Sequence, residues 1–152
     1  MSDASSNVRQ LIVEGERGMV IYNPEGLSAP LGQYSHVTRV RPKELLFIAG
    51  MLAADKDGNS VGHGDFEKQM DQIFANLKTV LESAGASFAN IVQFTTYLVS
   101  PSLIPELMAY RTKNFPTMFE NGAYPPNTLL MVNRLVHEEF LVEVQAIAAL
   151  TS

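Results

Sequence analysis

The chain has 152 residues, of which 46% are hydrophobic and 18% are charged, a composition typical of one globular domain and unlike that of a disordered protein. Eleven Lys and Arg residues against sixteen Asp and Glu residues give a net charge of −5 without any basic run, which argues against nucleic acid as a partner. The chain has no cysteine, which excludes disulfides, a thiolate nucleophile and any zinc or iron–sulfur site bound through cysteine.

Residues 1–17 are predicted to be a polar leader, and residues 18–152 are predicted to be a single domain. The leader lacks the apolar region of a signal peptide, so we expect a cytoplasmic protein. The longest apolar run, residues 45–54, is far shorter than the about 20 residues needed to cross a bilayer, and we therefore expect no membrane insertion.

Three strands are predicted before the first helix. Residues 18–22 (GMVIY) are apolar and end at the turn NPEG, and residues 36–41 (HVTRVR) alternate with period two. Residues 45–53 are apolar on both faces, which is typical of a strand at the centre of a sheet.

The clearest helix begins after Asp65, a suitable N-cap, and its apolar positions recur at steps of three and four until Gly85 stops it. Residues 89–99 are rich in β-branched and aromatic residues and are predicted to form a strand. Ser100 followed by Pro101 predicts the start of a second helix, which continues to about residue 115 or 119. Two last strands are predicted over residues 127–135 and 140–149.

The predicted order is therefore β-β-β-α-β-α-β-β, an α+β two-layer sandwich with a mixed six-stranded sheet and two helices on one face. The other face of that sheet needs cover, because residues 45–53 and 128–132 are largely apolar on both sides. Oligomerisation through this face is the simplest source of that cover.

Glu143 is the most informative single residue. In an alternating strand Leu141, Glu143 and Gln145 share a face, so a carboxylate lies in the middle of an otherwise apolar segment. A desolvated carboxylate has a raised pKa, which suits general acid or base catalysis near neutral pH. If the face is solvated instead, Glu143 is an ordinary surface residue.

Tyr34 follows a Pro- and Gly-containing loop just before a strand, where its phenol could bind a ligand or simply pack the loop. The three histidines have no partner at ligand spacing, so no metal site is predicted. The chain contains no nucleotide-binding, zinc-protease or serine-hydrolase motif, and no cofactor is expected.

Four segments stand in a fixed order: residues 28–35 (SAPLGQYS), 47–51 (FIAGM), 69–85 with 91–92, and 133–135 followed by 142–148. Together they resemble the motifs of the Rid/YjgF family of imine deaminases, over about residues 23–149. The resemblance implies a chorismate-mutase-like α+β sandwich that forms homotrimers, with a pocket between each pair of adjacent subunits. It also implies hydrolysis of small enamines or imines to a 2-keto acid and ammonia without a cofactor.

The resemblance assigns roles to three residues of this chain. Tyr34 matches the pocket tyrosine, Glu143 matches the glutamate that positions the attacking water, and Gly50 matches the strand glycine beside the pocket. The backbone at Leu130 is expected to complete the pocket together with Gly50.

Four pocket positions depart from the family pattern. Asn127 occupies the place of the arginine that grips the substrate carboxylate, and Leu129 occupies the place of a cysteine two residues later. Ala49 and Met51 replace a serine and a glutamine. An amide binds a carboxylate far less well than an arginine fork, so these changes imply an uncharged or bulkier ligand than 2-aminoacrylate.

The leading interpretation is a Rid-type hydrolase that converts an imine, an enamine or a related polarised small molecule to a carbonyl product. In this interpretation Glu143 activates water, while Tyr34 and Asn127 orient the substrate. The altered pocket positions leave open a different class, a homotrimer that binds a small molecule or a partner without catalysis. A nuclease is disfavoured by the net charge of −5.

Overall fold

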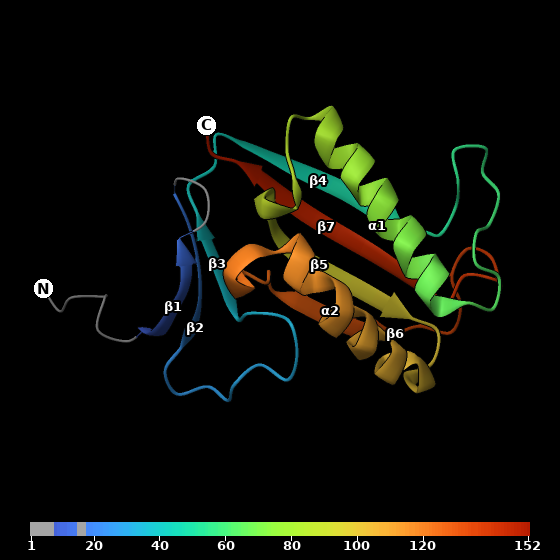
Figure 1. Ribbon diagram of the computed structural model, residues 1–152, viewed down its shortest axis with the longest axis horizontal. Helices are drawn as coiled ribbons and strands as arrows, with labels where there is room; N and C mark the ends of the chain where they lie inside the picture. The colour runs from blue at the N-terminus through green and yellow to red at the C-terminus, as the bar shows by residue number, and fades with distance from the viewer. Residues whose placement is uncertain (1–7, 15–17) are drawn as a thin grey trace, which may run out of the picture.

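The computed structural model describes residues 8–14 and 18–152. Seven strands and two α-helices lie in this part of the chain: β1 (Val8–Glu14), β2 (Met19–Pro24), β3 (Val37–Val40), β4 (Glu44–Met51), α1 (Phe66–Ser83), β5 (Ile91–Leu98), α2 (Ile104–Met118), β6 (Asn127–Met131) and β7 (Val142–Leu150). Figure 1 shows both helices on the same side of the sheet that contains β4, β5, β6 and β7. The predicted α+β class, with two helices on one face, is confirmed.

The strands are grouped differently from the prediction of one six-stranded sheet. They form a three-stranded sheet in the order β1-β2-β3 and a four-stranded sheet in the order β4-β7-β5-β6. The additional strand, β1, lies in the expected polar leader and pairs antiparallel with β2. β1 was missed because hydrogen bonds to the backbone of β2 hold it in the sheet. The residue pattern of a segment does not show which strand it will pair with. Residues 1–7 and 15–17 of the expected leader lie outside the described residues.

The division between the sheets falls at the short connection from β3 to β4. Pro42 has no backbone N–H to offer a ladder, and the next residue, Lys43, donates its N–H to the carbonyl of Leu150 at 2.8 Å. The chain therefore joins the β4–β7 ladder directly and leaves β3. As a result β4 is an edge strand of the described sheet, so the expectation of a central strand over residues 45–53 was wrong.

Both helices form where the sequence predicted them. Asp65 caps α1 by accepting the backbone N–H of Lys68 at 3.1 Å, and Gly85 follows the helix with a φ of 72° that favours glycine. Ser100 accepts the N–H of Ser102 at 3.2 Å and opens a short 3₁₀ turn that leads into α2. These caps satisfy backbone groups that a helix end would otherwise leave without partners.

The core lies between the helices and the four-stranded sheet. The ring of Phe74 on α1 has its centre 5.9 Å from that of Phe94 on β5 and 5.6 Å from that of Phe115 on α2. The opposite side of the sheet is exposed: Phe47 is 75% exposed, Leu45 44% and Leu130 40%. We name this side the open face; alternation and register place the following residues on it: Leu45, Phe47, Ala49, Thr95, Tyr97, Leu130, Glu143, Gln145 and Ile147.

Candidate functional site

Glu143 lies on the open face beside an irregularity in β4. The ladder between β4 and β7 shifts register there, so residues 49 and 50 are both opposite Gln145, as in a β-bulge. The carboxylate of Glu143 fills the space next to Gly50, where a Cβ atom would overlap Oε1 and lie 2.7 Å from Cδ. Glu143 can hold this position only because residue 50 has no side chain.

The carboxylate of Glu143 is partly withdrawn from water. Burial raises its pKa above the ordinary value of 4.5. Within residues 18–152, no group donates a hydrogen bond to this carboxylate and no cation forms an ion pair with it. A carboxylate with a raised pKa and free oxygens can take a proton from water, which is the chemistry of a general base.

Tyr97 belongs to the same site and was missed by the sequence analysis. It lies directly opposite Glu143 in the β5–β7 ladder, and its hydroxyl donates to Oε1 of Gln145 at 3.3 Å. The alternation in β5 puts Tyr97 on one face of its strand, but only the register of two distant segments places it against Glu143. The open face thus carries a short polar strip of Glu143, Gln145 and Tyr97 among apolar neighbours.

The contact between Gly50 and Glu143 makes a direct prediction about stability. Gly50→Ala should lower the free energy of unfolding by about 1–3 kcal/mol, because the new methyl group forces the Glu143 side chain out of its position. In a Glu143→Ala background the same substitution should have little effect, since the clash is gone. Urea denaturation of the four proteins measures this coupling, and equal effects in both backgrounds would contradict the described contact.

Two of the predicted apolar pocket residues lie near Glu143, and two do not. Ala49 is exposed beside Gly50, and Leu130 is opposite Tyr97, so both belong to the open face. Met51 and Leu129 instead pack against the hydrophobic core on the helix side of the sheet. The pleat alternates side chains between the two faces, so neighbours in sequence are separated by the sheet.

Asn127, at the start of β6, also turns toward the helix side. Its Oδ1 accepts hydrogen bonds from the hydroxyl of Thr96 at 2.7 Å and from Nη2 of Arg111 at 3.0 Å. Thr96 and Arg111 are themselves buried, at 0% and 3% exposure. In a single copy of the chain, Asn127 and Glu143 therefore lie on opposite sides of the sheet.

Tyr34 lies in the loop before β3. Its hydroxyl accepts the N–H of Leu31 at 3.2 Å, and its ring makes an edge contact with His36. The same loop passes along α2, since a Cβ at Gly32 would lie 3.2 Å from Sδ of Met108. The residues predicted to form one site thus lie in three places in one copy: the open face, the helix side of the sheet and this loop.

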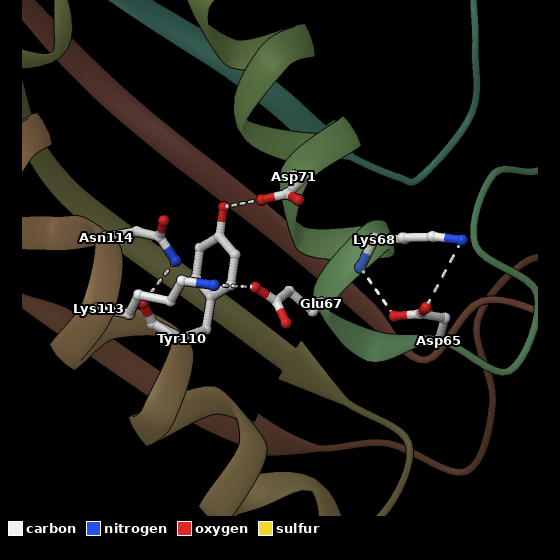
Figure 2. A network of polar contacts seen from close by, with 7 residues as sticks. All are labelled: Asp65, Glu67, Lys68, Asp71, Tyr110, Lys113 and Asn114. Atoms are coloured by element: carbon white, nitrogen blue, oxygen red, sulfur yellow. Dashed lines mark hydrogen bonds and ion pairs between the residues drawn. The ribbon is translucent and has the colours of Figure 1, made fainter.

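A cleft of about 410 Å³ lies between the start of α1 and the middle of α2. Two pairs of polar groups connect the helices there: the hydroxyl of Tyr110 donates to Asp71 at 2.9 Å, and Nζ of Lys113 contacts Glu67 at 2.6 Å, as Figure 2 shows. Burial and the hydrogen bond to Asp71 raise the pKa of Tyr110 well above its ordinary range. These contacts tie the two helices together across the cleft.

In the described part of the chain, no three residues among the histidines, aspartates and glutamates come close enough to hold a metal ion. None of the described helices combines the length and the apolar character that crossing a membrane requires.

Comparison with known proteins gives consistent results. A protein-family model described as endoribonuclease L-PSP matches residues 26–150. A RutC family protein of Pyrococcus horikoshii is 28% identical over 124 residues, which cover 82% of this chain and 92% of the relative. The RutC family protein YjgH of Escherichia coli is 26% identical over 81% of this chain and 90% of its own.

The described fold also resembles solved structures. The crystal structure of the Rid-family protein YyfB of Yersinia pestis matches with a TM-score of 0.77 and 32% sequence identity, over 88% of this chain and 99% of that chain. The structure of YjgH matches with a TM-score of 0.59 and 27% identity, over 79% of this chain and 85% of that chain.

Proposed function

The chain belongs to the Rid/YjgF family, and on this premise we propose that it is a hydrolase of small imines or enamines other than 2-aminoacrylate. The observation that carries the proposal is the carboxylate of Glu143, held against Gly50 with a raised pKa and free oxygens. No cofactor is needed for this chemistry. Water adds to the carbon of the C=N bond, and the products are a carbonyl compound and ammonia or an amine.

Glu143 acts on the water molecule in this proposal. Its carboxylate accepts a proton as the water oxygen bonds to the imine carbon and passes this proton to the nitrogen, which gives a carbinolamine. The hydroxyl proton of the carbinolamine is then transferred through Glu143 to the nitrogen as the C–N bond breaks, which releases the amine and leaves the carbonyl product. Tyr97 and Gln145 are placed to orient the water or the substrate. Gly50, Ala49 and the backbone at Leu130 form the nearby wall.

Tyr34 and Asn127 join this site only across copies of the chain, so the proposal includes a homotrimer with pockets between subunits. What supports an assembly is the open face, on which Phe47 is 75% exposed. A groove of about 390 Å³ also runs along the free edge of β4, lined by residues from Leu45 to Met51 and by the end of α1. Exposed apolar surface of this kind is typical of an interface.

The assembly makes its own prediction. Light scattering after size exclusion should give a mass of about three times 16.7 kDa for the wild type. Phe47→Glu should shift the mass toward that of a monomer, because it puts a charge in the proposed interface. Ala75→Glu, an equal charge change at an exposed position of α1, should leave the trimer intact. A monomeric wild type would contradict the assembly.

The activity is tested by ammonia release from a panel of imines generated in solution, with and without the protein. Release above the spontaneous rate that is proportional to protein concentration is the expected result. A ligand that binds tightly and is recovered unchanged, with no accelerated release for any imine, would instead favour a binding protein without catalysis.

A further inference from the structure

Among residues 18–152, Arg111 is a buried cation without a carboxylate partner. Its Nη2 donates to Oγ1 of Thr96 and to Oδ1 of Asn127, both at 3.0 Å, and its Cζ lies 5.4 Å from the centre of the Phe115 ring. All three partners are neutral, and the Nε–H is buried without an acceptor. Within the described residues no carboxylate forms an ion pair with it.

Burying this charge is costly to the fold, because the guanidinium loses its hydration. Hydrogen bonds to neutral groups do not fully compensate for that loss. Burial lowers the pKa of Arg111 to about 10, so the guanidinium remains positively charged at neutral pH. An anion that approached the site would supply the missing partner.

The contacts of Arg111 also decide which way the amide of Asn127 is turned. A guanidinium only donates hydrogen bonds, so the amide oxygen must face Arg111, and the hydroxyl of Thr96 donates to the same oxygen. The NH₂ group of Asn127 is then left with no acceptor among the described residues, and Asn127 is partly exposed. Asn127 therefore presents donors outward, with a positive charge directly behind them.

We propose that Arg111 and Asn127 form a subsite for a small carboxylate, in which the Asn127 NH₂ group donates to a carboxylate oxygen and Arg111 supplies the charge. Asn127 contacts the ligand, and Arg111 is a positioning residue that acts through it. This inference rests on the proposed function only in placing Asn127 at the ligand. The buried, unpaired charge of Arg111 is a property of the fold and does not depend on whether the protein hydrolyses imines.

The subsite changes the expected ligand. Considered alone, Asn127 in place of an arginine predicts an uncharged ligand, but Arg111 returns the positive charge from α2, 16 residues earlier in the chain. The charge lies one side chain further from the ligand than in a direct arginine contact, so binding should be weaker than that of a bidentate fork. The subsite should nevertheless bind a charged carboxylate more tightly than a neutral ligand of the same shape.

The test compares propionate with propionamide, which have nearly the same shape and differ in charge. The protein is labelled with ¹⁵N, and the side-chain NH₂ signals of Asn127 are assigned by their loss in Asn127→Asp. Propionate should shift these signals until they saturate. The dissociation constant of propionamide should be at least about tenfold higher than that of propionate. Equal binding of both compounds, or no shift with propionate, would overturn the inference.

Asn127→Asp gives a second, independent result. The new carboxylate should pair with Arg111, raise the unfolding temperature and abolish propionate binding. Asn133→Asp, an equal charge change at an exposed position, should change neither. A lower unfolding temperature for Asn127→Asp, or propionate binding that survives in it, would show that Arg111 has only a structural role. Because the readouts are binding and stability, they are unaffected if imine hydrolysis is not found.

Discussion

Glu143→Gln is expected to lower kcat/KM for imine hydrolysis by about 10²–10⁴-fold, the usual effect of removing a general base. Glutamine has nearly the same size and should still lie against Gly50, but it cannot accept a proton from water. The rate of ammonia release measures the loss. Glu44→Gln, the same change at an exposed position of β4, should leave the rate unaltered. If both variants kept full activity, Glu143 would not be the base.

The pH dependence follows from the raised pKa of Glu143. Only the deprotonated carboxylate accepts a proton, so the wild-type rate should rise with pH through an inflection above 4.5, and this inflection should be missing in Glu143→Gln. The free energy of unfolding depends on pH with the opposite sign, because the contribution of Glu143 to it falls as pH rises. The penalty for burying the charge is absent below the unfolded pKa and fully present above the folded pKa. The Gln variant should therefore gain stability relative to the wild type as pH rises through this window.

Gln69→Leu is expected to lower the free energy of unfolding by about 3–5 kcal/mol. It leaves the carbonyl of Glu139 and the N–H of Leu141 without partners, and it removes one of the two hydrogen bonds to the carbonyl of Gly62. Gln69 on α1 is 1% exposed. Its Nε2 donates to the carbonyls of Gly62 at 3.1 Å and Glu139 at 2.8 Å, and its Oε1 accepts the N–H of Leu141 at 2.8 Å. These bonds hold the segment that leads into β7 and thereby help to place Glu143.

Urea denaturation measures the effect of Gln69→Leu, and Gln72→Leu is the matched control on the same helix. Gln72 makes one hydrogen bond, to Asn76 at 2.8 Å, and is partly exposed, so its replacement should cost less than about 1 kcal/mol. A loss for Gln69→Leu no larger than that of the control would mean that water or a shifted backbone satisfies the freed groups.

Local patterns predicted most of the secondary structure. The apolar spacing from Phe66 to Leu81, with Asp65 before it and Gly85 after it, identified α1 almost to the residue. The β-branched run at residues 89–99 identified β5 in the same way. Periodicity and caps depend on residues within a few positions of one another, so they can be read from the sequence without knowledge of the fold.

Pairing between distant segments was not predictable in this way. The apolar residues 45–53 indicated a central strand, yet β4 is an edge strand whose outward residue Phe47 is 75% exposed. A strand that is apolar on both faces looks the same whether its cover comes from its own chain or from another copy. The missed strand β1 has the same cause, because its partner β2 is what holds it in a sheet.

Glu143 could be identified as a candidate site residue from strand alternation, Tyr34 from its place in a loop before a strand, and Gly50 from the family resemblance. Tyr97 could not be, because only the β5–β7 register places it opposite Glu143. Arg111 could not be either, since an arginine within a helix is most often a surface charge.

The opening composition predicted a small acidic domain without a thiol or a basic surface, and the sequence by itself determined its helices, most of its strands and the carboxylate on β7. Only the tertiary structure decided that Glu143 is held against Gly50, that Asn127 lies on the other side of the sheet, and that Arg111 stands behind it. The physical reason is that a side chain's type and its face on a strand are local properties. What it contacts and how far it is removed from water depend on segments far away in the chain.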